Sequence, residues 1–367
     1  MTHHGEREIT GWVMTEPGKP FEKQTLSIPA PAAGEVLVEV AGCGVCHTDI
    51  SFLHLGVKTR KAPPLILGHE IAGRVIEVGQ GGDADPAAIA AAKALEGKPV
   101  LVPAVLPCGI CELCRAGHRT ICRAQIMPGN DRHGGFASHV VVPARYVCPV
   151  PDAVLAKNEL WELSIVSDAM TTPFMSVKRS GLAAGDLAIV IGAGGVGIHA
   201  VQIAAATGAK VIALDVDDAK LEQAKSSGAG AVINVRGLDP KALKGKMAEA
   251  GKAMGAPKFC TKIFETSGTK AGQDTGFGLL TFGSYMAVVG FTMDKLDLRL
   301  SNLMAFDATV RGNWGCDPEL YPEVLDWIGS GRLKVKPYVE GHPLEEANAV
   351  FDAAHHGKLV RRAVLKP

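Results

Sequence analysis

The stretch LAIVIGAGGVGIHAVQIAAATGAKVIALD, residues 187–215, decides the fold. It is apolar enough to resemble a membrane span, but clustered glycines and the polar His199 and Gln202 interrupt it. We therefore predict a buried strand, a glycine turn, a helix and a second strand. Apolar and helical runs continue to alternate as far as residue 291, which is typical of βαβ units in a doubly wound parallel sheet.

The glycine turn VIGAGGVG, residues 190–197, contains the pattern G-x-G-x-x-G. In such a turn Gly192 makes the tight bend, Gly194 lets a pyrophosphate approach the backbone, and Gly197 lets the helix pack on the strand. Gly195 lies in the same turn and belongs to the predicted contact. The N–H groups and partial positive charge of the helix N-terminus favour phosphate. The turn therefore predicts a dinucleotide site.

Asp215 ends the second strand, close to the ~20-residue offset expected of a ribose-binding acid. An aspartate there accepts hydrogen bonds from the ribose 2′-hydroxyl and repels the additional phosphate of NADP. The sequence therefore predicts NAD. The competing interpretation is that Asp215 only caps the following helix, which begins DVDDAKLEQ.

The whole chain has 367 residues, a length that favours two domains. Up to about residue 160 it is β-rich, with alternating runs such as EVLVEVAGCG separated by turns rich in Gly and Pro. An insert at 81–99 contains an alanine run that predicts a short surface helix. After residue 311 the run DPELYPEVLDWIGSG predicts a helix with Asp317 as its N-cap.

Composition narrows the classes of function. Basic and acidic residues balance at 38 each, so the bulk charge gives no reason to bind nucleic acid or an anionic membrane. The first ten residues are polar and charged and carry no apolar leader, so we expect a cytoplasmic protein. Disulfides are rare there, and the nine cysteines therefore favour thiolate ligation of a metal.

A four-cysteine segment, PCGICELCRAGHRTIC, supplies the clearest metal motif. Its spacing is C-x2-C-x2-C-x7-C, and the thiols are Cys108, Cys111, Cys114 and Cys122. Four thiolates close every tetrahedral position of Zn²⁺, which predicts a structural zinc with a net charge of −2. Basic side chains interleaved with the thiols are expected to offset this charge: Arg115, His118, Arg119 and Arg123. A nucleic-acid-binding zinc ribbon is the competing interpretation, but it would not explain the glycine turn.

A second candidate metal site lies in GCGVCHTD and GHEIAGRV, residues 42–49 and 68–75. Cys46, His69 and Glu70 would bring a thiolate, an imidazole and a carboxylate to one zinc and leave a position open, as catalytic zinc sites do. From these residues alone, CGVC could also be a redox pair and His69 a core histidine.

Taken together, these motifs resemble the zinc-dependent medium-chain alcohol dehydrogenase family. The matching pieces are GCGVCHTD, GHEIAGRV, the four-cysteine segment, VIGAGGVG and ALDVDDAKLEQAKSSGA, in the family's order and over nearly the whole chain. The resemblance implies NAD, two zinc ions per subunit, and a homodimer or homotetramer. It also implies a β-rich GroES-like catalytic domain at 1–166 and 311–367 with a zinc lobe at 103–125, and a Rossmann domain at 167–310.

The resemblance also implies a catalytic zinc held by Cys46 and His69, with Glu70 close to the metal. The third ligand position, commonly cysteine in the family, is Asp168 in VSDAMTTPF. A carboxylate is a harder ligand than a thiolate but carries the same charge, so one thiolate, one carboxylate and Zn²⁺ still sum to zero. Zinc in such a site lowers the pKa of an alcohol hydroxyl and promotes hydride loss to nicotinamide.

Thr48 matches the hydroxyl that takes the alcohol proton, with a helix N-cap as its competing interpretation. Many members continue the proton path through a histidine three residues later, where this chain has Ser51. The proton would then leave through water, His47 or His54. Asp49 matches an acid that orients the zinc-ligating histidine.

The resemblance implies further cofactor contacts. Thr172 would lie beside the nicotinamide, Lys220 would reach the adenosine ribose, and Arg361 would neutralise the pyrophosphate. His47 is also expected among the cofactor-binding residues. For Lys220 and Arg361 a solvated side chain is the competing interpretation.

Within the family, residues 12–26 and 52–70 resemble members that oxidise a ring hydroxyl of a cyclic CoA thioester to a ketone. Lys58, Arg60 and Lys61 would then meet CoA phosphates, or else form a solvated basic loop. The competing hypotheses are a polyol or small-alcohol dehydrogenase, a zinc-free enoyl or quinone reductase, and a non-catalytic NAD-binding zinc protein. We expect no nucleic-acid or membrane partner.

Overall fold

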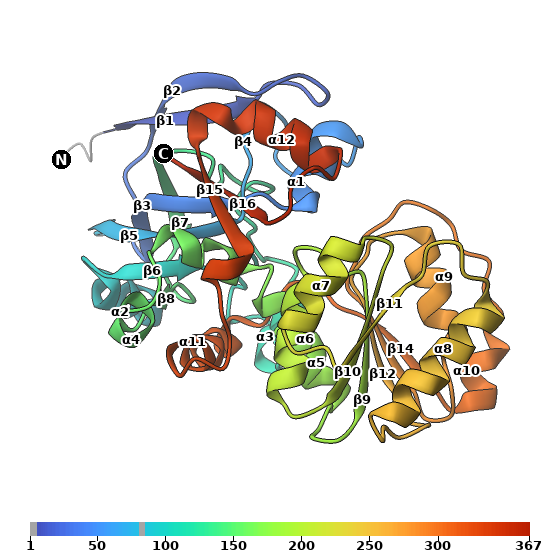
Figure 1. The fold of residues 1–367 in the computed structure, drawn as a ribbon. Coiled ribbons are helices and arrows are strands. Elements are labelled where there is room, and N and C mark those ends of the chain that lie inside the picture. Colours follow the sequence, from blue (N-terminus) through green and yellow to red (C-terminus); the bar gives the residue numbers. More distant parts are fainter. Residues whose placement is uncertain (1–5, 81–84) are drawn as a thin grey trace. The chain divides into compact units, whose positions relative to one another are not determined.

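The computed structural model describes residues 6–80 and 85–367, and over these residues the chain divides into two compact units. One unit extends to Thr171 and resumes at Gly315, and the other is Thr172–Trp314 (Figure 1). The domain changes expected after residues 166 and 310 lie a few residues earlier along the chain than these boundaries.

The Thr172–Trp314 unit contains a parallel sheet with the strand order β11-β10-β9-β12-β13-β14. Its strands are β11 (Ala231–Asn234), β10 (Lys210–Asp215), β9 (Leu187–Ile191), β12 (Lys262–Glu265), β13 (Tyr285–Val288) and β14 (Thr309–Gly312). The chain order reverses at β9, which pairs with β10 on one side and β12 on the other. Ligands of such sheets bind outside the carboxyl ends of the strands at this switch point. The Rossmann fold expected from residues 187–215 is confirmed.

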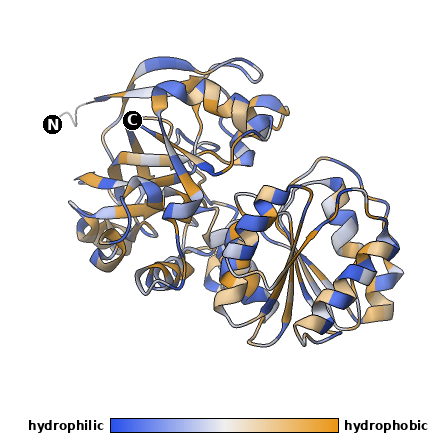
Figure 2. Cartoon of the chain, in the orientation of Figure 1, coloured by the Kyte–Doolittle hydropathy of each residue, from blue (hydrophilic) through white to orange (hydrophobic). Residues whose placement is uncertain are grey.

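Helices cover both faces of this sheet (Figure 1). On one side lie α5 (Thr171–Ser180), α6 (Gly197–Ala206) and α7 (Asp218–Ser226), and on the other α8 (Pro240–Ala253), α9 (Lys270–Gly278) and α10 (Ser301–Phe306). The strands are apolar and the helices are mixed in character (Figure 2), because the strands are covered twice and each helix only once. The result is the expected doubly wound architecture.

The other unit is built on a mostly antiparallel sheet with the order β15-β16-β3-β5-β6-β8, in which β7 also pairs with β3. The strands are β15 (Val339–Pro343), β16 (Arg362–Lys366), β3 (Glu35–Gly44), β5 (Glu70–Val78), β6 (Pro99–Val102), β8 (Cys148–Pro149) and β7 (His139–Pro143). A smaller sheet has the order β2 (Glu22–Ile28), β1 (Arg7–Met14) and β4 (Leu65–Ile66).

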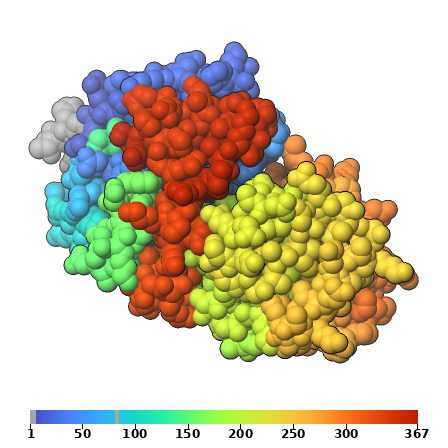
Figure 3. Space-filling model, in the orientation of Figure 1, coloured from blue at the N-terminus to red at the C-terminus, as the bar shows by residue number. Residues whose placement is uncertain are grey.

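The C-terminal segment completes this unit. Strand β16 pairs antiparallel with β3, and the Asn348 side chain bonds the backbone N–H and carbonyl of Phe21 at 2.7 and 3.0 Å. Figure 3 accordingly shows the C-terminal segment against the N-terminal strands on the surface. The return of the chain to its first domain is therefore part of the fold.

Short helices connect the strands of this unit. They are α1 (His47–His54), α2 (Pro86–Leu95), α3 (Glu112–Arg115), α4 (Asp152–Leu155), α11 (Tyr321–Gly329) and α12 (Ala347–His355), with 3-10 turns η1 (Arg119–Ile121), η2 (Trp161–Ser167), η3 (Pro318–Leu320), η4 (Lys336–Tyr338) and η5 (Leu344–Glu346). Two predicted helices are confirmed: the alanine run is α2, and the run after residue 311 is η3 and α11, with Asp317 as N-cap. Residues 81–84 of the insert and 1–5 of the N-terminal stretch lie outside the described residues.

All nine cysteines lie in the described part of the chain and are free thiols, as expected without a disulfide framework. Of the helices formed by the described residues, none combines the length and apolar character that crossing a bilayer requires.

Candidate active site

Cys46 and Asp49 fix the start of helix α1. Cys46 is the N-cap, and its backbone N–H donates to Asp49 Oδ2 at 3.1 Å. This reciprocal capping arrangement places the Cys46 sulfur at the N-terminus of α1. Thr48 is the second residue of α1, so its interpretation as the N-cap is wrong. Its hydroxyl lies 3.7 Å from Cys46 Sγ, beside the thiol rather than on the helix backbone.

His69 precedes strand β5 and is almost fully buried. Its Nδ1 lies 3.3 Å from Asp49 Oδ1, and this oxygen accepts a hydrogen bond from the Gly68 N–H at 3.1 Å. The Asp49 carboxylate is therefore held by the backbone and faces the His69 ring. This is the position from which it is expected to orient the zinc-ligating histidine. The other ring nitrogen, Nε2, is left to face the acid Asp168.

Asp168 follows η2, and its Oδ2 lies 3.7 Å from Cys46 Sγ and 3.6 Å from His69 Nε2. Two atoms at 2.0–2.3 Å from one zinc at a tetrahedral angle are roughly 3.3–3.8 Å apart. The three side chains thus have the spacing of ligands to a single zinc. Together with Glu70, their ligand atoms all lie within 4.8 Å of one another.

Glu70 is fully buried, and Arg362 forms a two-pronged ion pair with it. Arg362 Nε donates to Glu70 Oε2 at 3.0 Å, and Nη2 donates to Oε1. Burial raises the pKa of Glu70 to about 7, although the Arg362 guanidinium acts in the opposite direction. Sequence reasoning missed Arg362 and selected Arg361, which is exposed. No local pattern distinguishes the two arginines, because β16 is buried continuously from Arg362 to Leu365 and shows no alternation.

The electrostatics of the site favour a cation. Burial by itself lowers the pKa of His69, but Asp49 and Cys46 raise it overall, well above its ordinary value. The field between these side chains thus favours positive charge. A zinc ion would be neutralised by the Cys46 thiolate and the Asp168 carboxylate, while Arg362 already neutralises Glu70. The donor set therefore fits the predicted catalytic zinc.

Ser51, at the place of the family's relay histidine, faces inward. It is buried, and its hydroxyl donates to the His47 carbonyl at 2.8 Å. His47 is exposed at the first position of α1. The His54 ring stacks on His355 with 4.8 Å between the ring centroids.

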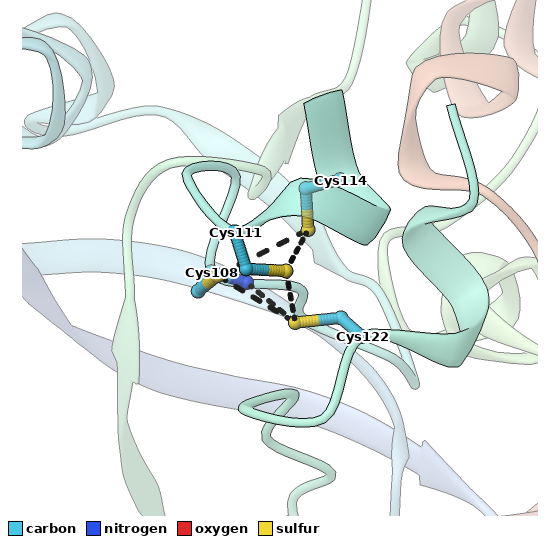
Figure 4. A group of neighbouring side chains, drawn as sticks. All are labelled: Cys108, Cys111, Cys114 and Cys122. Atoms are coloured by element: carbon cyan, nitrogen blue, oxygen red, sulfur yellow. Dashed lines mark hydrogen bonds between the residues drawn. The ribbon is translucent and has the colours of Figure 1, made fainter. Parts of the chain in front are cut away.

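The four cysteines of residues 108–122 converge on one point (Figure 4). Four sulfurs at 2.3 Å from a tetrahedral zinc would be roughly 3.8 Å apart. The observed Sγ–Sγ distances are 4.0 Å for Cys108–Cys114, 3.5 Å for Cys111–Cys114, 3.8 Å for Cys111–Cys122 and 3.6 Å for Cys108–Cys122. The set matches a closed, structural zinc site.

One expectation about this lobe needs correction. Arg119 does not serve primarily to offset the thiolates, because its guanidinium pairs with Asp317 at 3.0 Å and with Glu319 at 2.6 Å. These acids lie at the start of the η3–α11 segment. Arg119 therefore ties the lobe to the returning C-terminal segment.

The glycine turn has the geometry that dinucleotide binding needs. Gly192 has φ +85°, and a Cβ at Gly194 would have no described atom within 4 Å, so a ligand can approach. At Gly197 a Cβ would collide with the Gly192 carbonyl, so the helix packs closely there. Gly195 is half-buried in the same turn. Among the described residues, no side chain caps α6, which leaves its N-terminus to phosphate.

Asp215 is held at the end of β10 by backbone N–H groups. Its Oδ2 accepts from Ala193 N at 2.7 Å, and its Oδ1 accepts from Val216 N at 2.7 Å and from Asp217 N at 3.0 Å. The interpretation of Asp215 as a helix cap is wrong, because Asp217 caps α7. Lys220 lies in the first turn of α7.

Thr172 lies at the start of α5, and it is buried. Its carbonyl accepts a hydrogen bond from Asn313 Nδ2 at 3.3 Å. The nicotinamide contact of Thr172 stays a prediction, as do the cofactor contacts of Lys220, Arg361 and His47.

Known proteins share this combination of fold and site. Residues 32–152 match the alcohol dehydrogenase GroES-like domain, and residues 195–330 match the zinc-binding dehydrogenase domain. An alcohol dehydrogenase of Geobacillus stearothermophilus is 32% identical over 357 residues, covering 96% of this chain and 98% of the relative.

Two solved structures are similar along their whole length. The alcohol dehydrogenase of the archaeon Aeropyrum pernix has a TM-score of 0.84 at 27% identity, covering 98% of this chain and 100% of that one. Acetophenone reductase of Geotrichum candidum, solved in complex with NAD, has a TM-score of 0.83 at 26% identity, covering 98% and 97%.

Fold and site together define a zinc-binding dehydrogenase. More narrowly, the chain belongs to the zinc-dependent medium-chain alcohol dehydrogenase family.

Proposed function

We propose that this alcohol dehydrogenase oxidises a secondary alcohol to a ketone, with NAD⁺ as the hydride acceptor. The observation that carries the proposal is the convergence of Cys46, His69 and Asp168 at the spacing of zinc ligands. The backbone-held acid Asp215 supports NAD over NADP, because a second negative charge beside it would be repelled.

Different residues of the chain would bind the zinc and transfer the alcohol proton. Cys46, His69 and Asp168 would hold the zinc, which supplies a Lewis acid that lowers the pKa of the substrate hydroxyl. Thr48, whose hydroxyl lies 3.7 Å from Cys46 Sγ, accepts the alcohol proton. Because the Ser51 hydroxyl is engaged by the His47 carbonyl, the proton then leaves through solvent or the exposed His47.

For the substrate we propose 6-hydroxycyclohex-1-ene-1-carbonyl-CoA, oxidised to the 6-oxo compound in anaerobic aromatic degradation. The likeness of residues 12–26 and 52–70 to enzymes of that reaction supports it. So does the basic loop between α1 and β4, where Lys58 is exposed and Lys61 half-buried. Arg60 contributes less to this loop than expected, because it pairs with Asp131 at 3.0 Å. A polyol or small aliphatic alcohol is the second candidate, favoured by the similarity to general alcohol dehydrogenases.

The test compares NAD⁺ reduction with the CoA ester, the pantetheine ester of the same ring acid, cyclohexanol, sorbitol and ethanol. The proposal expects the CoA ester to have a kcat/KM at least about 100-fold above the free alcohols, equivalent to about 2.7 kcal/mol. Equal or faster turnover of a free alcohol would contradict the CoA substrate and favour the second candidate.

A charge-reversed variant, Lys58→Glu with Lys61→Glu, tests the loop. It should raise KM for the CoA ester about tenfold and leave the pantetheine ester unchanged, because only CoA carries the phosphates. Cys46→Ser, which removes a predicted ligand, is the control for the zinc requirement: retained activity would favour a zinc-free reductase.

A further inference from the structure

Asp168 lies outside regular secondary structure. It lies in the turn between η2 and α5 with φ −146° and ψ −60°, outside the helical region. Its own backbone N–H reaches the Ile165 carbonyl only at 3.4 Å, at the long end of the hydrogen-bond range. A metal ligand must nevertheless be held within a few tenths of an ångström. The backbone on either side of the turn therefore bears directly on where this carboxylate lies.

The preceding residue, Ser167, is fully buried and tied to three distant segments. Its hydroxyl donates to the Ile71 carbonyl at 2.8 Å, next to Glu70 on β5. Its carbonyl accepts from the Ala104 N–H at 3.3 Å and from the Tyr321 hydroxyl on α11. The backbone immediately before Asp168 is thus bound to the strand that carries Glu70 and to the returning C-terminal segment.

We infer that Tyr321 is a positioning residue for the catalytic metal: its hydroxyl holds the Ser167 carbonyl and so sets Asp168 toward Cys46 and His69. The inference rests on the zinc centre of the proposed function. Tyr321 is 1% exposed and its ring packs in the core, but packing needs only the ring. The hydroxyl is the part that reaches the turn. Without it, the bond from Ala104 that remains at the Ser167 carbonyl is long, at 3.3 Å.

The variant Tyr321→Phe separates these two roles, because it keeps the ring and removes the hydroxyl. The measurement is zinc release from the full chain into excess chelator, followed by a chromogenic zinc indicator. The four-cysteine zinc of the same molecule serves as an internal reference. We expect one of the two zinc ions to leave about tenfold faster than in the unchanged chain, as losses of supporting contacts to metal ligands usually do. The reference zinc should leave at its usual rate.

The matched control is Tyr285→Phe, which removes a tyrosine hydroxyl from strand β13 of the other unit and should leave both release rates unchanged. A second variant, Ser167→Ala, removes the bond to Ile71 and should speed release of the same zinc ion. It keeps the test decisive if Tyr321→Phe fails to fold. Cobalt substitution gives an independent readout, since a displaced Asp168 shifts the visible absorption of the Cys46-bound metal.

Two results would overturn the inference: an unchanged release rate at the catalytic centre, or equal acceleration at both centres, which would mean general loosening. Failure of the proposed function is distinguishable. If Cys46→Ser leaves the zinc content of the chain unchanged, the catalytic zinc centre itself is absent. If the unchanged chain binds two zinc ions and Tyr321→Phe releases both normally, only the positioning role of Tyr321 is lost.

Discussion

At the residue scale, two adjacent arginines lie in opposite environments, one exposed and one buried. Arg362 is buried against Glu70, and Arg361 points to solvent. A carboxylate removed from water requires a partner, and here the partner comes from 292 residues further along the chain. When Glu70 is ionised, the two charges of this pair cancel, so Glu70 needs no metal ion to balance it.

Replacing Arg362 with methionine should destabilise the protein by about 3–5 kcal/mol above pH 7, because a buried carboxylate loses the guanidinium that pairs with it. Burial already places the pKa of Glu70 at about 7. Below that pH the acid keeps a proton and is neutral, so the loss should shrink as pH falls from about 8.5 to 5.5. Urea denaturation at several pH values measures this.

Arg361→Met is the matched control for Arg362. It should leave the urea midpoint unchanged and, if Arg361 meets the pyrophosphate, raise KM for NAD⁺. An unchanged urea midpoint for Arg362→Met at pH 8.5 would show that the ion pair carries no net stabilisation.

The predicted role of Asp215 is to select NAD over NADP. A hydrogen bond from a ribose hydroxyl to a charged acceptor contributes about 1.5–3 kcal/mol, so Asp215→Asn should lower kcat/KM for NAD⁺ about 10- to 100-fold. Activity with NADP⁺ should rise, because the repulsion is removed. Kinetics with both nucleotides check this, with Asp217→Asn, a change in the neighbouring cap of α7, as control. If both variants keep the ratio of NAD⁺ to NADP⁺ activity of the unchanged chain, Asp215 does not select the nucleotide.

At the element scale, the glycine turn is held by a clamp on a single peptide group. The Gly192 carbonyl accepts from Thr266 Oγ1 at 2.7 Å, and the Ala193 N–H of the same peptide donates to Asp215 at 2.7 Å. Because the peptide group is planar, fixing both ends fixes its orientation. The turn after β12 therefore positions both the backbone predicted to bind phosphate and the acid predicted to bind ribose.

Thr266→Val should raise KM for NAD⁺ about fivefold with little change in kcat, since it removes one hydrogen bond that contributes about 1 kcal/mol. Thr266→Ser keeps the hydroxyl and should restore the original KM. Steady-state kinetics with varied NAD⁺ measure the effect. A fall in kcat at unchanged KM would argue against the clamp.

These contacts mark what the sequence could and could not predict. The ligand segments, the glycine turn and Asp215 were predictable because each is a local pattern of spacing or alternation. Arg362, Tyr321 and Thr266 were not, because their partners lie 292, 154 and 74 residues away. A local pattern carries no information on which distant side chain will meet it.

At the scale of the whole molecule, each unit has its own sheet and core, and the zinc lobe belongs to only one of them. Arg119 joins that lobe to Asp317 and Glu319 at the start of the C-terminal segment. The lobe therefore supports the unit that contains the candidate catalytic centre, and it is separate in sequence from the nucleotide turn.

Cys111→Ser should reduce the bound zinc from two ions per chain to one and lower the thermal midpoint by about 5 °C or more, because a structural zinc contributes folding free energy. The affinity for NAD⁺ should stay within about twofold, since distant changes act independently. Metal analysis, thermal denaturation and NAD⁺ titration measure the three quantities. Full zinc content or an unchanged midpoint would exclude a structural zinc in the lobe.

The late position of strand β16 has a consequence for biosynthesis. On the ribosome, Thr172–Trp314 emerges before the strand that pairs with β3 and brings Arg362 to Glu70. Domains generally fold in order of translation. A nascent chain that has emerged from the ribosome as far as Trp314 should therefore protect its Rossmann core from protease while β3 and β5 are still cleaved. Glu70 therefore gains its ion-pair partner, Arg362, only when translation is nearly complete.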